Sequence, residues 1–505
     1  MNETNRDGIA HGSSTEKRPA EARRIQANSG SQLRKPLCSL LPASMPSPSL
    51  RLAVVGAGAA GLAAARELRR EGHAPVVFER AAAVGGTWLY ASPAPAAAAD
   101  PLGAAATHSS LYASLRTNLP REVMGFLDFP FTAARGSVVD ARRFPGHQEV
   151  LRYLEDFTQR FDLYGLVRFQ TEVVGVRREA GGRWAVTSRK LGEKGEQDEE
   201  LYDAVVVCNG HYSEPRVASI PDPPTIVNLT GDLYFPTLTG ADAWPGKQMH
   251  SHNYRVPEPF LDQVVIVIGA SASAVDISRD IASVAKEVHI ADRSAPTSTC
   301  EQQPEYDNMW LHSMIDHAQG DGTVVFQDGS SIKADVIMHC TGYLYDFPFL
   351  GDDSTITVDD NCVDPLYKHV FPIEVAPDLS FIGVPWKVIP FPLVELQSKW
   401  VAGILSGRIK LPSKDEMMED VKAIYSRLET RGWPKRYTHN FSGGYQFEYD
   451  DWLAEQCGHP PIEEWRKLMY AANAKNKAAR PERYRDEWDD DGLVALANED
   501  FKKYF

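Results

Sequence analysis

The early part of the chain has a hydrophobic pattern typical of alternating strands and helices. An apolar run at Leu52–Val55 leads into a glycine-rich turn, apolar positions recur at helical spacing over Leu62–Leu68, and a second apolar run follows at Val76–Phe78. Continuous apolar runs are typical of strands buried on both faces, and a period of about 3.6 residues is typical of a helix packed on a core. The pattern predicts a strand–helix–strand unit.

The same pattern recurs near the middle of the chain. Val264–Ile268 lead into another turn of small residues, Ala274–Ile281 continue at helical spacing, and Val288–Ile290 form the next apolar run. Repeated units of this kind build open parallel sheets covered by helices. The fold class is therefore predicted to be α/β.

Two further apolar runs, Asp203–Cys208 and Ala334–Met338, each end in a turn of small residues. A strand is expected around Trp184, and the acidic stretch Glu193–Glu200 is expected to be a loop. Because one apolar run precedes the second unit and the other follows it, we expect two nested Rossmann-type dinucleotide-binding domains, the first interrupted by the second, with a helical C-terminal region. The expected ranges are 51–215 and 333–410 for the first domain, 216–332 for the second domain and 411–505 for the helical region.

The N-terminal segment differs in composition from the rest. Residues 1–44 hold seven basic and four acidic residues with little apolar periodicity, so residues 1–50 are expected to be a disordered leader. The segment also has some features of a transit peptide, which would direct the protein to a plastid. Met45 offers an alternative start just before the first strand.

Charge and cysteine usage narrow the function classes. The net charge of -15 argues against a nucleic-acid or anionic-membrane surface. The six cysteines lie far apart and form no C-x-x-C pair. We therefore expect a reducing compartment and predict no metal site. No stretch approaches the roughly 18 apolar residues of a transmembrane helix. We expect a cytoplasmic protein, with the plastid as the alternative.

The first turn fits the G-x-G-x-x-G fingerprint of dinucleotide-binding domains. Its glycines permit a tight turn, close approach of the backbone to a pyrophosphate, and close packing of the helix. Glu79 ends the second strand about 20 residues on, where a carboxylate binds ribose hydroxyls and disfavours a 2′-phosphate. The expected dinucleotide contacts are Gly56, Ala57, Gly58, Ala59, Ala60, Gly61 and Glu79.

The second turn is a looser copy of the fingerprint. Serine replaces its second glycine and alanine its third, and the two serine hydroxyls could contact phosphates. The position equivalent to Glu79 is Asp292, with Arg293 beside it; Asp disfavours a 2′-phosphate and Arg favours one, so charge alone leaves NADPH and NADH open. The expected contacts are Gly269, Ala270, Ser271, Ala272, Ser273, Ala274 and Arg293.

Trp244–Tyr254 resembles the F-x-G-x-x-x-H-x-x-x-[F/Y] fingerprint of flavin-containing monooxygenases, with Trp244 in place of Phe. Related Baeyer–Villiger enzymes end this motif in Pro or Asp followed by Trp. The ending Tyr254-Arg255 therefore favours the branch that oxidises heteroatoms.

Other segments resemble the same family: Gly85–Trp88, Leu115–Arg121, Asp128–Phe131 and Cys340–Tyr343. The resemblance covers residues 51 to about 445 and is greatest to the plant S-oxygenase-like group, the glucosinolate S-oxygenases. It implies FAD at the first turn and NADPH at the second, with Gly86, Trp88 and Thr341 as further cofactor contacts.

Asn118 matches the family asparagine that lies beside the flavin, and is the predicted catalytic residue. The alternative is that it only forms the turn before Leu119-Pro120. His250 of the fingerprint is more easily explained as structural than as a base.

The implied activity is a monooxygenase that consumes NADPH and O2 and oxidises a small thioether to a sulfoxide. N-oxygenation of amines, Baeyer–Villiger chemistry and oxidative decarboxylation of a keto acid remain alternatives with the same cofactors, and a homodimer is left open. A disulfide reductase with two such domains would need a redox cysteine pair, and a nucleotide sensor would not consume O2. Residues 221–240 lengthen a link that is short in the family.

Overall fold

The computed structural model describes residues 49–91, 100–103, 108–133, 138–192, 196–220, 244–351 and 355–505. Nearly all of the expected leader and the whole of the 221–240 insertion lie outside the described residues.

The first sheet is parallel and has the strand order β23-β7-β1-β2-β3. It is built around β1 (Arg51–Val55), which pairs with β2 (Ala74–Phe78) on one side and with β7 (Ala204–Val207) on the other. β3 (Val167–Arg168) and β23 (Leu379–Phe381) form its edges. Because β23 follows the whole second unit in sequence, the first sheet draws on two distant segments of the chain, as the nested arrangement predicts.

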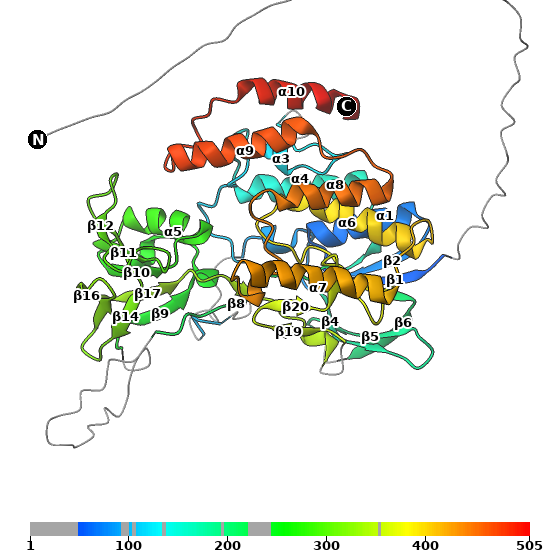
Figure 1. Ribbon diagram of the computed structural model, residues 1–505, viewed down its shortest axis with the longest axis horizontal. Coiled ribbons are helices and arrows are strands. Elements are labelled where there is room, and N and C mark those ends of the chain that lie inside the picture. The colour runs from blue at the N-terminus through cyan, green and yellow to red at the C-terminus, as the bar shows by residue number, and fades with distance from the viewer. Residues whose placement is uncertain are drawn as a thin grey trace, which may run out of the picture. The chain divides into compact units, whose positions relative to one another are not determined.

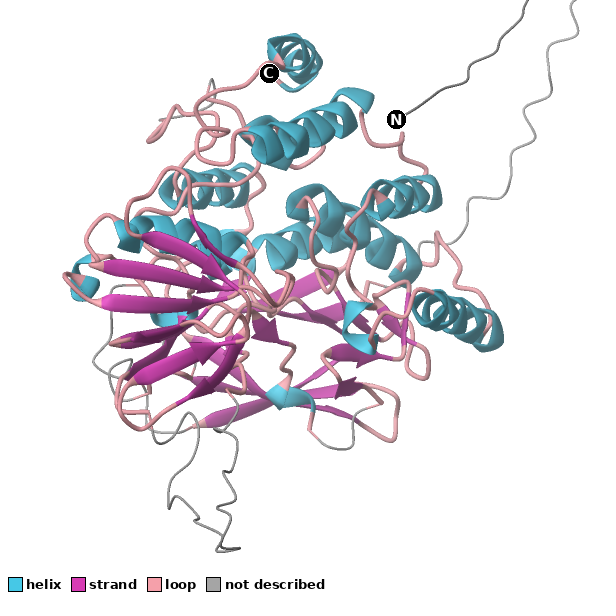
Figure 2. Cartoon of the chain, turned by 60° about the vertical axis from the view of Figure 1, so that its left-hand side comes forward, coloured by secondary structure: helices cyan, strands magenta, loops and turns pink. Residues whose placement is uncertain are grey.

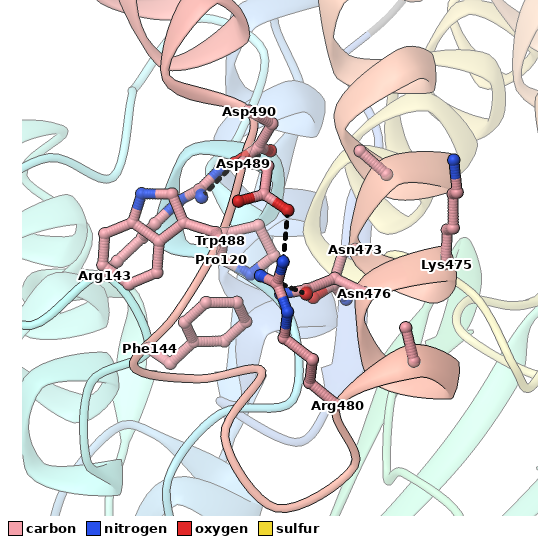
Figure 3. A pocket seen from close by; sticks show the side chains of 12 residues that line it. Pro120, Arg143, Phe144, Asn473, Lys475, Asn476, Arg480, Trp488, Asp489 and Asp490 are labelled. Carbon is pink, nitrogen blue, oxygen red and sulfur yellow. Dashed lines mark hydrogen bonds and ion pairs between the residues drawn. The ribbon is translucent and has the colours of Figure 1, made fainter.

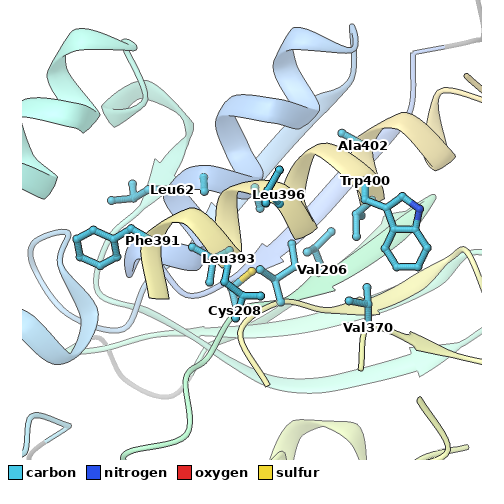
Figure 4. Close-up of a cluster of buried hydrophobic side chains, with 14 of the residues drawn as sticks. Leu62, Val206, Cys208, Val370, Phe391, Leu393, Leu396, Trp400 and Ala402 are labelled. Carbon is cyan, nitrogen blue, oxygen red and sulfur yellow. The ribbon is translucent and has the colours of Figure 1, made fainter. Parts of the chain in front are cut away.

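Both faces of this sheet are covered, which explains the continuous apolar runs. Leu52 and Val54 face the cluster under helices α1 (Ala59–Arg70) and α6 (Pro390–Leu405), whereas Ala53 and Val55 face a second cluster. Figure 4 shows side chains of α1 and α6 meeting those of β7. The second cluster is closed by an antiparallel sheet of β4 (Thr171–Arg178), β5 (Trp184–Lys190) and β6 (Gln197–Tyr202).

Strand β6 corrects part of the expectation of an acidic loop over Glu193–Glu200, of which residues 193–195 lie outside the described residues. Gln197–Tyr202 pairs antiparallel with β5 at the edge of its sheet, where acidic side chains face solvent. Arg51 lies 2.7 Å from Glu200 and offsets part of the charge.

The second sheet has the order β12-β13-β11-β10-β17-β9. Its parallel strands are β9 (Lys247–His250), β10 (Val264–Ile268), β11 (Glu287–Ala291), β13 (Met309–His312) and β17 (Val336–His339). β12 (Cys300–Gln302) is antiparallel to β13. Helix α5 (Ala272–Ala282) covers one face, and the antiparallel sheet of β14 (Ile315–Ala318), β15 (Thr323–Phe326) and β16 (Ser331–Lys333) covers the other.

The return to the first domain comes later than the expected boundary at residue 333. β17 pairs with β10, so Val336–His339 belong to the second sheet. Two segments of the chain connect the domains, one leading into the second domain and one leading back. They run side by side, because β8 (Glu214–Pro215) pairs antiparallel with β18 (Tyr343–Leu344). An apolar run predicts a buried strand, but it does not specify which of two sheets the strand joins.

The C-terminal region is helical, as expected. It contains α7 (Lys414–Thr430), α8 (Tyr445–Cys457), α9 (Glu464–Ala479) and α10 (Asp491–Phe501), coloured orange to red in Figure 1. Helix α8 packs on α6, while α9 packs on the short helix α3 (Arg121–Met124) and on α10. Helix α4 (His147–Arg160) contributes to the core under α6. Figure 2 shows that most of the helices lie on one side of the strands. Across the part of the chain that the structure describes, no helix has the length and apolar character needed to cross a bilayer.

Candidate functional site

The first glycine turn follows β1 and is shaped by close backbone contacts. Gly56 has a φ of +105°, and a Cβ there would lie 2.6 Å from the carbonyl oxygen of Cys208. A Cβ on Gly61 would lie 1.8 Å from the carbonyl oxygen of Gly56. The first and third glycines are therefore required by the turn itself.

The middle glycine lies against a second glycine segment. Gly58 begins α1, and a Cβ on Gly86 would lie 2.9 Å from its Cα atom. Gly86 starts the 3₁₀ turn Gly86–Trp88, in which Trp88 is half-buried. The first turn of α1 holds no acidic residue, and Gly58 has no side chain to cap it, so its N–H groups are free to bind a phosphate.

Glu79 fixes the same turn from the end of β2. It is buried, one carboxylate oxygen accepts a hydrogen bond from the Ala57 amide at 2.7 Å, and the other accepts one from the Ala81 amide at 2.8 Å. Each carboxylate oxygen can accept a second hydrogen bond. The carboxylate is thus held beside the turn in the position from which it can bind a ribose hydroxyl.

The second turn repeats this geometry. Gly269 has a φ of +115°, and a Cβ there would lie 2.7 Å from the carbonyl oxygen of Cys340. Cys340 follows β17 as Cys208 follows β7, so each turn passes the end of the neighbouring strand. Ala274 is buried in the third-glycine position, whereas Ser271 and Ser273 are exposed. Ser271 makes no side-chain capping bond to α5, so both hydroxyls are available to a ligand.

The structure separates the roles of Asp292 and Arg293. Asp292 accepts a hydrogen bond from the Ser294 amide at 2.9 Å and so closes the turn after β11. Arg293 is exposed, and no described residue pairs with its guanidinium. The guanidinium of Arg293 is thus available to a 2′-phosphate, the group that an arginine at this position accommodates.

The Trp244–Tyr254 segment forms the edge strand β9 and its exit. The Trp244 indole donates a hydrogen bond to the Gly322 carbonyl at 3.1 Å, and a Cβ on Gly246 would lie 2.2 Å from the indole ring. The Tyr254 hydroxyl donates to Asp280 on α5 at 2.5 Å. The motif therefore binds the edge strand to the rest of the second domain.

His250 at the end of β9 is fully buried, and its Nδ1 atom accepts a hydrogen bond from the His252 amide at 3.0 Å. Burial lowers the pKa of His250 to about 3. A ring this weakly basic stays neutral at physiological pH, which agrees with the structural role expected of His250.

Thr341 and Asn118 differ in how freely they can reach a ligand. The Thr341 hydroxyl donates a hydrogen bond to the Arg216 carbonyl, which lies on the other of the two segments that connect the domains. This hydroxyl is therefore engaged within the protein. The exposed Asn118 side-chain amide has no partner within the described ranges, while its backbone carbonyl accepts a hydrogen bond from Asn473 of α9 at 3.1 Å.

The flavin-binding monooxygenase-like family model matches residues 49–298 and 308–463. The chain belongs to this family. The flavin-containing monooxygenase GS-OX-like 5 of Arabidopsis thaliana is 55% identical, with 92% of this chain and 100% of the relative aligned. The structure of S-allyl-L-cysteine S-oxygenase from Allium sativum is 59% identical, with a TM-score of 0.83 and coverage of 91% of this chain and 100% of that one.

A more distant structure, Tmm from Pelagibacter sp., is 25% identical, with a TM-score of 0.69 over 86% of this chain and 93% of that one. As a flavin-containing monooxygenase, the chain uses FAD and NADPH and consumes O2. The disulfide reductase and sensor alternatives are thereby excluded.

Sequence reasoning missed a residue that connects the parts of this monooxygenase site. Arg485 follows α9, its Nε donates to the Thr117 carbonyl at 3.0 Å, and its two terminal nitrogens donate to Asp276 of α5 at 3.0 and 2.6 Å. Arg485 thus joins the backbone next to Asn118 to the helix that follows the second turn. Nothing in the local sequence around Arg485 signals this role.

A cavity lies beside the Asn118 segment, between Pro120, Phe144 and the residues of α9 and its following loop (Figure 3). Its arginines are paired within it: Arg143 lies 2.5 Å from Asp490, and Arg480 lies 2.6 Å from Asp489. These two ion pairs join the C-terminal region to the first domain across the cavity.

Proposed function

We propose that this flavin-containing monooxygenase transfers one oxygen atom of O2 to the sulfur of a small thioether and forms a sulfoxide. The observation that carries the substrate class is the full-length similarity to the S-allyl-L-cysteine S-oxygenase of Allium sativum, at 59% identity. The GS-OX-like relatives of Arabidopsis thaliana, at about 55% identity, support the same class.

The two turns would hold the cofactors through backbone groups. The turn at Gly56–Gly61, whose close backbone contacts exclude a Cβ at Gly56 and at Gly61, fits the FAD pyrophosphate, with Glu79 on the ribose. The turn at Gly269–Ala274 fits the second dinucleotide, with Arg293 on the 2′-phosphate. When bound, the flavin accepts hydride from NADPH and activates O2, and this chemistry belongs to the cofactor.

The protein's own residues supply placement and electrostatics. Asn118 presents an amide that can donate a hydrogen bond to the activated oxygen, and Arg485 fixes the backbone beside it relative to α5. Soft thioether sulfur needs no general base, which agrees with the neutral, buried state of His250.

The test is to purify the full chain, record its absorption spectrum, and follow NADPH oxidation with a thioether, a tertiary amine or a cyclic ketone. We expect a flavin spectrum and sulfoxide formed in proportion to NADPH consumed. A colourless protein would contradict the cofactor assignment. N-oxide or lactone as the main product would contradict the substrate class.

Asn118→Ala tests the predicted catalytic residue. We expect the variant to retain flavin, because the proposed pyrophosphate and ribose contacts come from Gly56–Gly61 and Glu79, and the backbone contact of Asn118 to α9 is unchanged. NADPH oxidation should then yield hydrogen peroxide in place of sulfoxide. An unchanged sulfoxide yield per NADPH would refute the role of the Asn118 amide.

A further inference from the structure

A cysteine, a histidine and an aspartate meet at the end of strand β13 in the second sheet. Cys300 opens β12 and lies opposite His312, the last residue of β13. Asp328 lies in the turn between β15 and β16. One ligand atom from each of the three residues lies within 4.8 Å of the others. Three types of metal ligand thus converge from three separate strands and turns.

The imidazole of His312 is held at both of its nitrogens. Nδ1 lies 3.2 Å from the Asp328 carboxylate and 3.1 Å from the Ser330 hydroxyl, whereas Nε2 lies 2.9 Å from Nδ1 of His289. Nε2 of His289 in turn lies 3.4 Å from Glu287. The order of groups is therefore Glu287, His289, His312, Asp328.

Stacking fixes the orientation of both rings. His312 stacks on Phe326 at 4.1 Å between ring centroids, and His289 stacks on Trp310 at 5.1 Å. Both histidines are buried, so neither ring can turn freely to change its partners.

The hydrogen bonds of the row allow His312 to act as a metal ligand. A neutral imidazole carries a single N–H, and the facing nitrogens of His289 and His312 share one proton. When Nε2 of His312 carries that proton, Nδ1 of His312 offers its lone pair on the side of the Asp328 carboxylate and the Ser330 hydroxyl.

We propose that Cys300, His312 and Asp328 bind a divalent cation of the zinc class. Thiolate, imidazole and carboxylate are all zinc ligands, and three protein ligands leave a fourth position for water. With bonds of about 2.0–2.3 Å, tetrahedral ligand atoms lie about 3.3–3.8 Å apart, so binding requires a contraction of about 1 Å. Cys300 is exposed and can supply this movement, while His312 and Asp328 are held in place.

The neighbouring residues have the arrangement expected around a zinc-bound histidine. With the metal on Nδ1 of His312, Nε2–H donates to His289, and His289 donates to Glu287. Metal-bound histidines commonly donate their second N–H to such a partner, which fixes the tautomer. The ion would link β12, β13 and the β15–β16 turn, and so stabilise this end of the second domain.

The test uses the full-length, flavin-loaded protein after treatment with a chelator. Zinc is titrated by calorimetry, and bound zinc is counted by elemental analysis after dialysis. We expect one zinc ion per chain and a higher unfolding temperature with zinc present. NADPH and substrate are absent, so the result does not depend on the proposed reaction.

Variants separate this site from adventitious zinc. Cys300→Ser and Asp328→Asn should each weaken binding at least tenfold, and His289→Gln should weaken it by about 10–100-fold as a neighbour of a ligand. Cys457→Ser, on α8, removes a thiol outside the cluster and should leave binding unchanged. Equal zinc content in the wild type and Cys300→Ser, or binding only at millimolar zinc, would overturn the proposal.

Discussion

Replacing Arg485 by Met tests whether this side chain sets the distance between the Asn118 segment and helix α5 of the second domain. The side chains of Arg485 and Asp276 are 14% and 19% exposed, and a fork of two hydrogen bonds joins them. Breaking a fully buried pair costs about 3–5 kcal/mol, and an exposed pair contributes below about 1 kcal/mol. With the third bond to Thr117 included, we expect a loss of about 2–3 kcal/mol of unfolding free energy.

The effect on activity should exceed the effect on cofactor content. Arg485 fixes Thr117, next to Asn118, relative to α5, which follows the second turn. A misplacement of about 1 Å at a reacting centre can cost about 100-fold in rate. We expect Arg485→Met to keep FAD, to lower kcat by about 10–100-fold, and to divert NADPH oxidation towards hydrogen peroxide.

The assays are urea unfolding and the ratio of sulfoxide to NADPH consumed. Arg483→Met is the matched control, since Arg483 is exposed and lies 3.7 Å from Glu487. Arg485→Lys should recover part of the activity, because lysine keeps the charge but lacks the fork. If Arg485→Met gives the same sulfoxide yield as Arg483→Met, the positioning role is wrong.

Three further predictions follow from charged side chains. In steady-state assays, Arg293→Ala should raise the KM for NADPH by about tenfold and leave the KM for NADH unchanged, since only NADPH carries the 2′-phosphate. Equal effects on the two KM values would contradict the placement of Arg293 on the 2′-phosphate. Arg66→Met should lower the unfolding free energy, measured in urea, by about 3–5 kcal/mol, because it breaks the buried 2.9 Å ion pair with Glu395. The control Arg70→Met removes a side chain that is 42% exposed and should lower it by less than about 1 kcal/mol. Losses of similar size in the two variants would refute the argument. Burial raises the pKa of Asp450 to about 8, so its contribution to stability falls as pH rises from its unfolded value towards 8. Asp450→Asn should therefore stabilise the protein more at pH 7.5 than at pH 5, and an equal gain at both would contradict that pKa.

The sequence predicts well the features that depend on neighbours along the chain. The run Val264–Ile268 coincides with β10, and the steric role expected of Gly56 and Gly61 is confirmed by their contacts. Most of the edge strand Gln197–Tyr202 lies in the range Glu193–Glu200 that is expected to be a loop, because its exposed residues are acidic and do not alternate with apolar ones.

Features that depend on distant contacts could not be predicted in this way. Arg485 meets Thr117 and Asp276 only after the C-terminal helices have packed. Cys300, His312 and Asp328 have no metal-ligand spacing in sequence, because the sheet brings them together through strand register.

The structure also explains why the Trp244–Tyr254 motif marks this family without containing a reactive group. The motif lies on the edge strand that enters the second domain, and its last residue binds α5 through Asp280. Arg255, which follows it, is buried and donates to the carbonyls of Ala91 and Ser109 in the preceding segment of the chain. Substitution here would alter how the two dinucleotide domains are joined. Since hydride must pass between cofactors held by different domains, the geometry of this junction matters to the reaction as directly as the turns that bind the cofactors.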